Sequence, residues 1–243
     1  MLEPAADGRV YRMQRRIRLA DTSASGRLRL DAAARYVQDI ATDDVADAGM
    51  DDGDHVWIVR RAVVEVRSPF QADTAVRVAT WSGGLGARWA TRRTSIDGDA
   101  GGHIEAETLW AFVHAETLKL ARLPPAYHAV YGDAVRDATV SGKLRLPQHP
   151  PEDARRVEWP LRVTDIDILG HVNNAVYWEA VESELVAADG FHGGAVVEYR
   201  QPVDLQTEVV LRVQERASGF LMWFVADGAV AAVAQVNGVE PPG

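Results

Sequence analysis

The sequence predicts an α+β protein built from two similar halves, each an antiparallel sheet wrapped around one long helix. Two sets of matched residues carry this prediction. The first set recurs 144 positions later at the same spacing, with Arg18, Asp21 and Gly26 returning as Arg162, Asp165 and Gly170. The second set recurs 133 positions later, with Val64–Pro69 returning as Val197–Pro202. Because the matches keep their order along the chain, they indicate a tandem duplication.

The composition is that of a globular chain, with 47% hydrophobic and 25% charged residues among 243. The absence of cysteine excludes disulfides, thiolate metal sites and a cysteine nucleophile. A net charge of −9 argues against general nucleic-acid binding, which depends on neutralising phosphates. No apolar run is long enough for a membrane helix, and residues 1–8 lack the apolar core of a signal peptide. We therefore expect a cytoplasmic protein without a membrane span.

The first half opens with an alternating strand pattern at Val10–Leu19 and a glycine turn. One long helix follows, with Asp31 as a candidate N-cap and Gly49 as a candidate C-cap. Its apolar stripe consists of Val37, Ile40, Ala41 and Val45. The strands expected after it are Val56–Arg67, Thr74–Ser82, Ala87–Ile96 and Ile104–His114, with turn residues at Asp97–Gly102.

The second half repeats this order. It has a strand at Val157–Val163 and then a helix ending at Gly190. The apolar stripe of this helix consists of Val176, Ala180, Val181, Leu185 and Ala188. The strands expected after it are Gly194–Arg200, Thr207–Glu215, Phe220–Ala226 and Ala229–Asn237, with a turn at Asp227–Gly228. One strand, one long helix and an antiparallel run of strands form the hotdog arrangement.

We accordingly expect two tandem hotdog domains, at residues 1–122 and 157–243. The proline-rich segment 123–156 is the predicted linker between them, with a short helix near Tyr127–Asp133.

The turn before the second helix gathers residues that can carry out chemistry. They are Asp167, Gly170, His171, Asn173 and Asn174. A helix N-terminus presents unpaired N–H groups that polarise a carbonyl or hold an anion. A carboxylate and an imidazole beside it can perform acid–base or nucleophilic steps. Each residue also has a structural alternative, because aspartate is common in turns and histidine or asparagine can cap a helix. The concentration favours an active site.

The first half lacks these groups. Ser23 stands at the position of Asp167, and Arg27–Leu30 stands at the position of His171–Asn174. We therefore expect one site per chain, in the second half, with the silent first half shaping a pocket or contacting a partner.

Three acids near the candidate site are interpreted as structural. Asp165 has a counterpart in the silent half, so we expect it to pair with Arg162, as Asp21 would with Arg18. Glu179 and Glu182 share a helix face, for which a solvated surface is favoured over an inward-turned nucleophile.

Other features are less specific. The tryptophans of the first half suit a large core or an acyl tunnel; they are Trp57, Trp81, Trp89 and Trp110. A basic group alternates as strand residues do, which favours a solvated face that could receive an acidic carrier domain or coenzyme A phosphates; it comprises Arg60, Arg61, Arg88, Arg92 and Arg93. Gly83–Gly86 is interpreted as a hairpin turn and not as a phosphate loop. Histidines and acids lack metal-ligand spacing, so no metal is expected.

With these residues in view, the chain resembles the acyl-acyl-carrier-protein thioesterases, whose fold is two tandem hotdog domains. The resemblance rests on Tyr36–Ala41 with Gly49, Val78–Trp81, Ala121–Pro124, and His171–Asn174 followed by Tyr177. It implies hydrolysis of a fatty acyl thioester in the second domain, selection of chain length in the first, and no cofactor. Substrate contacts are expected from Trp57, Trp81, Trp89 and Tyr177.

The resemblance also implies catalytic positions. Plant-type members of the family place an aspartate four residues before the histidine, an asparagine two before it, and a glutamate or cysteine after the next strand. Asp167 and His171 match, whereas Leu169 stands at the asparagine position. The later acid falls near Gln201–Val203, where no acid or thiol stands.

The run from Asp167 to His171 is equally similar to the 4-hydroxybenzoyl-CoA thioesterase type. That resemblance implies an aspartate acting as nucleophile or general base. We expect the thioester carbonyl to sit on N–H groups near Gly170 and His171, with His171 or an asparagine orienting the reactants.

The expected partner is an acyl carrier protein or coenzyme A thioester. The alternatives are an acyl-CoA thioesterase, a hotdog hydratase acting on enoyl thioesters, and a non-catalytic acyl-binding module. A tandem pair already supplies the helix partnership of a hotdog dimer, so both a monomer and a homodimer are compatible with the sequence.

Overall fold

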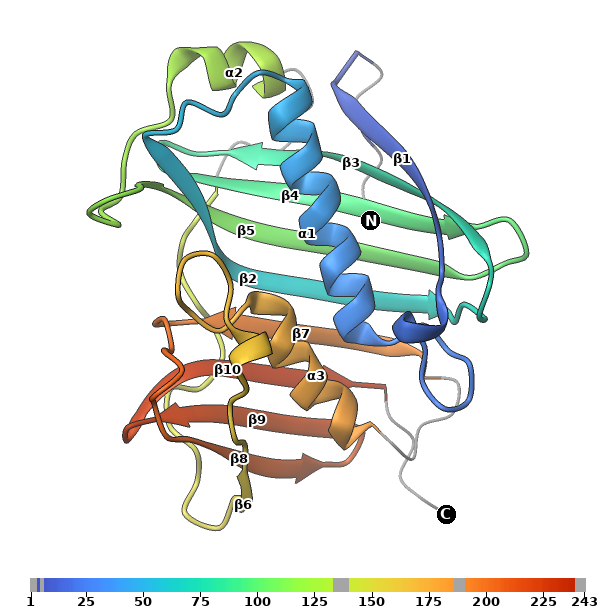
Figure 1. Cartoon of the computed structure of the whole chain (residues 1–243), viewed down its shortest axis with the longest axis vertical. Helices are drawn as coiled ribbons and strands as arrows, with labels where there is room; N and C mark the ends of the chain where they lie inside the picture. The colour runs from blue at the N-terminus through green and yellow to red at the C-terminus, as the bar shows by residue number, and fades with distance from the viewer. Residues whose placement is uncertain (1–3, 5–6, 133–139, 186–190, 239–243) are drawn as a thin grey trace.

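All the strands among the described residues join one antiparallel sheet, and both long helices lie on the same face of it (Figure 1). The structure is a computed structural model that describes residues 4, 7–132, 140–185 and 191–238. The strand order is β1-β3-β4-β5-β2-β7-β10-β9-β8-β6. Each half of this order contains one repeat, which confirms the predicted α+β fold with two hotdog units. No helix in these described ranges is long and apolar enough to cross a membrane.

The first repeat contains five strands around α1, which spans Leu30–Asp47. Its strands are β1 at Val10–Arg16, β2 at His55–Ser68, β3 at Ala75–Leu85, β4 at Trp89–Gly98 and β5 at His103–His114. The stripe residues Val37, Ile40 and Ala41 are buried, as the helical spacing predicts. The short helix α2, Pro125–Tyr131, follows near the C-terminal end of α1 (Figure 1). The predicted end of that short helix, Asp133, lies outside the described residues.

The second repeat is a shorter copy of the first. Its helix α3 spans Asn174–Glu184. Its strands are β6 at Arg155–Glu158, β7 at Gly193–Tyr199, β8 at Val209–Arg216, β9 at Gly219–Ala226 and β10 at Ala229–Asn237. The stripe residues Val176, Ala180, Val181 and Leu185 are buried. The predicted stripe residue Ala188 and helix end Gly190 lie outside the described residues.

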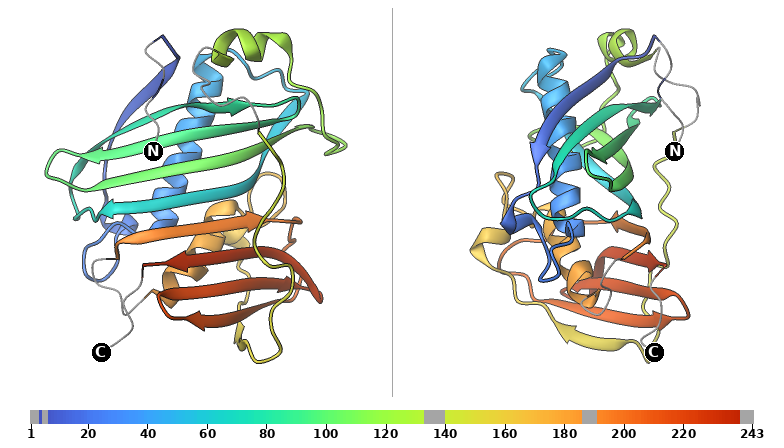
Figure 2. Two further views of the ribbon diagram at one scale, coloured as in Figure 1. Left: turned by 180° about the vertical axis from the view of Figure 1, so that it is seen from behind. Right: turned by 90° about the vertical axis from the view of Figure 1, so that its right-hand side faces the viewer.

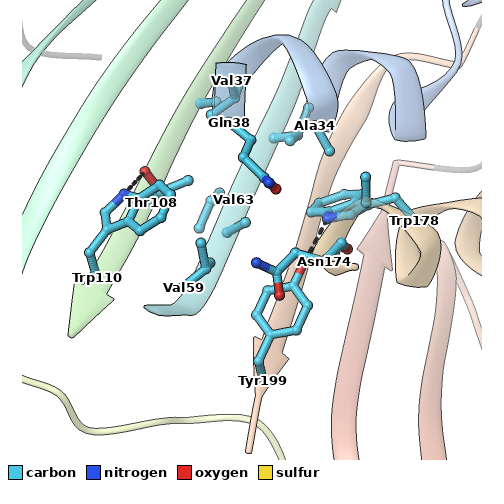
Figure 3. Close-up of a pocket in the computed structure, with 14 residues that line it drawn as sticks. Ala34, Val37, Gln38, Val59, Val63, Thr108, Trp110, Asn174, Trp178 and Tyr199 are labelled. Carbon is cyan, nitrogen blue, oxygen red and sulfur yellow. Dashed lines mark hydrogen bonds between the residues drawn. The ribbon is translucent and has the colours of Figure 1, made fainter. Parts of the chain in front are cut away.

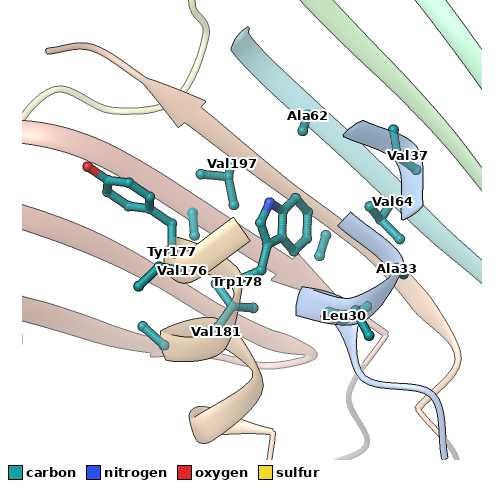
Figure 4. Packing of buried hydrophobic residues seen from close by; sticks show 14 of the residues in the cluster. Leu30, Ala33, Val37, Ala62, Val64, Val176, Tyr177, Trp178, Val181 and Val197 are labelled. Atoms are coloured by element: carbon teal, nitrogen blue, oxygen red, sulfur yellow. The ribbon is translucent and has the colours of Figure 1, made fainter. Parts of the chain in front are cut away.

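The two repeats share one core. Strands β2 and β7 pair from Arg61 opposite Glu198 to Val66 opposite Gly193, so the two half-sheets become continuous. Above this seam α1 and α3 pack against each other, and the buried indole of Trp178 lies between α3 and Leu30, Ala33 and Val37 of α1 (Figure 4). A fully buried large side chain contributes about 2–3 kcal/mol of stabilisation. Burial of Trp178 therefore stabilises the packing of the two repeats against each other.

Residues 140–154 of the proline-rich segment cross the sheet on the face opposite the helices (Figure 2). The buried Glu198 carboxylate accepts the N–H groups of Arg145 and Leu146 at 2.7 and 2.9 Å. The indole N–H of Trp223 donates to the Pro147 carbonyl at 3.0 Å. These bonds satisfy polar groups that the segment would otherwise bury unpaired.

Three local predictions differ from the structure. Asp31 is not the N-cap of α1, because that position is Arg29 and Asp31 lies inside the helix, where it accepts from Arg29 and Arg35. The strand expected at Val157–Val163 ends at Glu158, and a short 3₁₀ turn forms at Val163–Asp165. The hairpin turn expected at Gly83–Gly86 is largely strand, because β3 continues to Leu85 through a bulge near Gly84.

Candidate active site

The loop before α3 is closed by its own backbone. The N–H of Asp167 donates to the His171 carbonyl at 2.9 Å, and the N–H of Gly170 donates to the Asp167 carbonyl at 3.0 Å. Gly170 has φ of +79°, a left-handed conformation that glycine adopts without the steric cost of a side chain. Because this N–H is used inside the loop, it is not available to the thioester carbonyl expected near Gly170 and His171.

The same loop holds the Asp167 carboxylate at the edge of a pocket. One oxygen, Oδ1, accepts the Leu169 N–H at 2.9 Å, which fixes the side chain. The other oxygen makes no hydrogen bond to any described residue. Ile168 and Leu169 are the exposed apolar residues of this loop, at 99% and 51% exposure, and both line the pocket beside Asp167. The carboxylate is thus oriented and accessible from the pocket.

The start of α3 provides a free donor beside that carboxylate. Asn173 is the N-cap, and its side-chain oxygen accepts the Ala175 N–H at 2.9 Å. The backbone N–H of Asn174 has no hydrogen-bond partner among the described residues, although its own carbonyl accepts the Tyr199 hydroxyl at 3.0 Å. Trp178 in turn donates to that hydroxyl at 2.9 Å (Figure 3). This network fixes the Asn174 carbonyl, and Asn174 itself lines the pocket.

The pocket has a volume of about 400 Å³ and extends from this loop into the first repeat. Its wall is formed by α1, α2 and the strands β2 to β5, and its mouth by residues 167–169, 173 and 174 of the second repeat. Apolar lining residues include Ala41, Met50, Trp57, Trp110 and Phe112. An elongated apolar group can therefore enter the first repeat while its polar end meets Asp167 and the Asn174 N–H.

The deep part of the pocket contains a buried ion pair. Arg92 is 7% exposed and its guanidinium pairs with Asp44 of α1, which also accepts Arg9 Nε at 2.7 Å. Ser82 lines the same region, and its buried hydroxyl has no partner among the described residues. The prediction that Arg92 lies on a solvated sheet face is therefore wrong, because its side of β4 faces the helix.

His171 occupies a different side of the loop. Its Nε2 lies 3.5 Å from Asp204 Oδ1, and it does not line the pocket. Asp204 directly follows the segment Gln201–Val203, in which the sequence offered no acid. The Val172 N–H donates to the Val203 carbonyl at 2.8 Å, which places the two loops side by side. The structure thus supplies a carboxylate for His171 that sequence spacing missed by one residue.

Of the four aromatic residues expected to contact substrate, the structure brings Trp57 to the pocket. Trp81 and Trp89 lie elsewhere; Trp89 contacts Gly142 of the crossing segment. Tyr177 is buried against Trp159 and Phe224 inside the second repeat, and this burial raises its pKa. Trp110 lines the pocket as well, consistent with the tunnel alternative for the tryptophans of the first half.

The first repeat has a loop with the same backbone hydrogen bonds before α1, but a side chain occupies the N–H group at the start of that helix. The Ser23 N–H donates to the Arg27 carbonyl at 2.8 Å, and Gly26 has φ of +84°. The buried Arg27 guanidinium, at the position equivalent to His171, pairs with Glu182 of α3. Glu182 Oε2 also accepts the N–H of Leu30, the first residue of α1, at 3.0 Å. In the first repeat a carboxylate therefore occupies the N–H at the helix start, whereas the equivalent N–H of Asn174 has no partner among the described residues.

The predictions for the acids near the site have different outcomes: the one for Glu182 is wrong, and the one for Asp165 is confirmed. Glu182 does not lie on a solvated face, since its side chain is 11% exposed. Asp165 pairs with Arg162 at 2.9 Å, as the sequence predicts. Its counterpart Asp21 differs, because its carboxylate accepts the Tyr36 hydroxyl at 2.7 Å.

Comparisons with known proteins agree on the family of both halves. Residues 8–131 match the family model of the acyl-ACP thioesterase N-terminal domain, where ACP is acyl carrier protein. Residues 148–222 match that of the acyl-ACP thioesterase C-terminal domain. An uncharacterised protein of Mycobacterium tuberculosis is 32% identical over 236 residues, covering 96% of this chain and 94% of that protein.

Solved structures show the same fold. An acyl-ACP thioesterase from Bacteroides thetaiotaomicron superimposes with a TM-score of 0.80 at 18% identity, covering 94% of this chain and 97% of that one. A 12:0-ACP thioesterase from Umbellularia californica gives 0.78 at 19% identity, covering 94% and 96%. These likenesses support the arrangement of two tandem hotdog units.

Proposed function

The chain belongs to the acyl-ACP thioesterase family, and on that premise we propose that Asp167 and the α3 N-terminus hydrolyse its acyl thioester substrate. The enzyme is a thioesterase. One observation carries the assignment of the site: an oriented carboxylate and a residue whose backbone N–H is unpaired among the described residues line the same largely apolar pocket. That combination suits a reaction in which an acyl chain is held in the pocket and its carbonyl is attacked at the rim.

The N–H of Asn174 is the proposed donor to the carbonyl oxygen. Support comes from the first repeat, where the equivalent N–H of Leu30 holds a carboxylate oxygen of Glu182 at 3.0 Å. A helix N-terminus stabilises such an anion through its partial positive charge. The oxyanion of a tetrahedral intermediate has the same chemistry, and one well-placed donor of this kind typically contributes about 3–4 kcal/mol.

The reaction then needs a base or nucleophile, which is the proposed role of Asp167. Acting as a base, its carboxylate takes a proton from water while the water oxygen bonds to the thioester carbon. The carbon–sulfur bond breaks, the sulfur accepts a proton, and the products are a carboxylic acid and a thiol. Acting as a nucleophile, Asp167 itself forms the new bond and water cleaves the resulting anhydride. Single turnover in ¹⁸O-labelled water tests the nucleophilic route: attack of water on the Asp167 carbonyl of the anhydride places label in Asp167, which the general-base route never does.

His171 is proposed to deliver the proton to the leaving sulfur. Its side chain lies on the exposed side of the loop and is 30% exposed. The Asp204 carboxylate can hold the imidazole orientation, as a carboxylate does for the histidine of a hydrolase triad.

The acyl chain is proposed to lie in the first-repeat pocket, against Trp57 and Ala41. The proposed physiological thiol is that of an acyl carrier protein, which rests on family membership. Coenzyme A thioesters are the second candidate, and the functional assay includes both.

The test is free-thiol release from acyl-ACP and acyl-CoA thioesters over a range of chain lengths. We expect release with a preference for acyl-ACP at matched chain length. Conversion of an enoyl thioester to a hydroxyacyl thioester without free thiol would instead identify a hydratase. Saturable binding of acyl thioesters with no product of either kind would identify a binding module.

A further inference from the structure

Gln38 is a polar side chain of the first repeat that faces the proposed site of the second. It lies on α1 and lines both the large pocket and a small adjoining cavity that also reaches Asn174 and Trp178. Figure 3 shows its carboxamide extending from α1 toward Trp178 and Asn174. Within the described ranges this carboxamide makes no hydrogen bond. A glutamine that lines a pocket with both its polar atoms unused has donors and an acceptor to offer a ligand.

The internal symmetry of the chain identifies what Gln38 faces. Adding the repeat offset of 144 places Gln38 at the position of Glu182, and Leu30 at the position of Asn174. In the first repeat the Glu182 side chain reaches across from α3 and contacts the Leu30 N–H directly. The same geometry in the second repeat directs Gln38 from α1 toward the Asn174 N–H. Gln38 thus stands next to the proposed position of the thioester oxygen.

We infer that Gln38 donates its Nε2–H to the thioester carbonyl oxygen, forming the oxyanion site together with the N–H of Asn174. This inference rests on the proposed function. It makes the active site composite, because Asp167 and Asn174 come from the second repeat and Gln38 comes from the first. The first repeat then contributes to the chemical step as well as to the acyl pocket.

The residue type fits this role. A glutamate at position 38 would place a carboxylate against the Asn174 N–H, as Glu182 does against Leu30, and so occupy the oxyanion position itself. Glutamine has the same length and shape but is neutral and carries an N–H donor. The two repeats therefore use one geometry in two ways: Glu182 closes its site with an ion pair to Arg27, and Gln38 leaves its site open.

Two substitutions of Gln38 separate a catalytic role from a packing role. Gln38→Met keeps the length of the side chain without a donor, and Gln38→Glu replaces the donor with a carboxylate. We expect both to lower kcat for thioester hydrolysis by roughly a hundredfold or more. Gln38→Met should change KM by less than about threefold, because the donor acts mainly on the developing oxyanion. The matched control is Glu182→Gln on α3, which changes the closed site of the first repeat and should leave kcat within about twofold of the wild type.

A binding measurement provides a readout that does not depend on turnover. The carboxylate of a free fatty acid can occupy the oxyanion position as the Glu182 carboxylate occupies its own. We expect Gln38→Met to weaken binding of decanoate by about tenfold and to leave binding of decanol unchanged, because only the carboxylate uses the donor.

The outcomes are distinct. A wild type that releases thiol alongside a Gln38→Met variant of equal kcat and equal decanoate affinity would overturn the role of Gln38 and leave the proposed function intact. A wild type that releases no thiol would overturn the proposed function and the inference with it.

Discussion

Substitution Glu182→Gln removes the charge from the carboxylate that closes the first-repeat site. Glu182 accepts from the Arg27 guanidinium and from the Leu30 N–H, and the side chains of this pair are 6% and 11% exposed for Arg27 and Glu182. The variant leaves the Arg27 charge buried without its counter-charge. It retains one amide oxygen, which can still accept from one of the two donors.

The expected loss follows from this burial. Breaking a buried ion pair by removing one partner costs about 3–5 kcal/mol, and the retained acceptor recovers part of that. We therefore expect the free energy of unfolding to fall by about 2–4 kcal/mol. For a chain of this size each kcal/mol lowers Tm by about 2–4 °C, so Tm should fall by roughly 5–15 °C.

The assay is denaturant unfolding of the wild type, Glu182→Gln, Arg27→Met and the double variant. Because Arg27→Met removes the stranded charge, the double variant should be more stable than Glu182→Gln alone. A loss below about 0.5 kcal/mol in Glu182→Gln, or additive losses in the double variant, would refute the reasoning.

Three further predictions concern the loop, the core and the pocket. Gly170→Ala and Gly26→Ala should each lower the free energy of unfolding in urea by about 1–2 kcal/mol, because both glycines have positive φ. Only Gly170→Ala should lower kcat, and equal losses of kcat in both variants would contradict a single site. Burial would raise the pKa of Asp31, but hydrogen bonds from two arginines outweigh it and hold that pKa below its usual value. The stabilisation by Asp31 is therefore present above the unfolded pKa near 3.9 and is lost as pH falls through the folded pKa. The free energy of unfolding of the wild type, measured by urea titration, should therefore exceed that of Asp31→Asn fully at pH 6, and this difference should shrink below about pH 4. A difference that does not change with pH would contradict this role of Asp31. Ala41→Phe fills the pocket and should reduce kcat/KM for long acyl chains more than for butyryl thioesters, whereas an unchanged chain-length profile would place the acyl chain elsewhere.

The duplicated pattern was enough to predict the fold, because each repeat preserves the residues that its own turns require. The two loops share a left-handed glycine and the same backbone hydrogen bonds, although their side chains differ. The position of Asp167 beside a helix start could therefore be predicted from the order of residues alone.

The inward direction of Arg92 had a signal that sequence reasoning did not use. Arg92 and the fully buried Ile96 are four residues apart on one strand, so they share a face. Asp44 continues the helical spacing of Val37, Ile40 and Ala41, which places an acid within the apolar stripe of α1. An arginine on the apolar face of β4 and an aspartate in the apolar stripe of α1 together indicate a buried ion pair.

The contacts between repeats had no such signal. Glu182 and Arg27 are separated by 155 residues, and Gln38 and Asp167 line one pocket although they belong to different repeats. Their proximity depends on the pairing of β2 with β7 and on the packing of α1 against α3. Neither can be predicted from local periodicity, so the composite site that we propose could be recognised only from the three-dimensional structure.

The central claim is that one thioesterase site operates in the second repeat, with Asp167 as its acid group. The direct measurement is kcat for thiol release by Asp167→Asn beside Ser23→Ala, its counterpart in the first repeat. Asparagine can keep the hydrogen bond from Leu169, so the loop should stay folded. We expect a loss of at least about a hundredfold for Asp167→Asn and no loss for Ser23→Ala. Wild-type kcat in Asp167→Asn would contradict it.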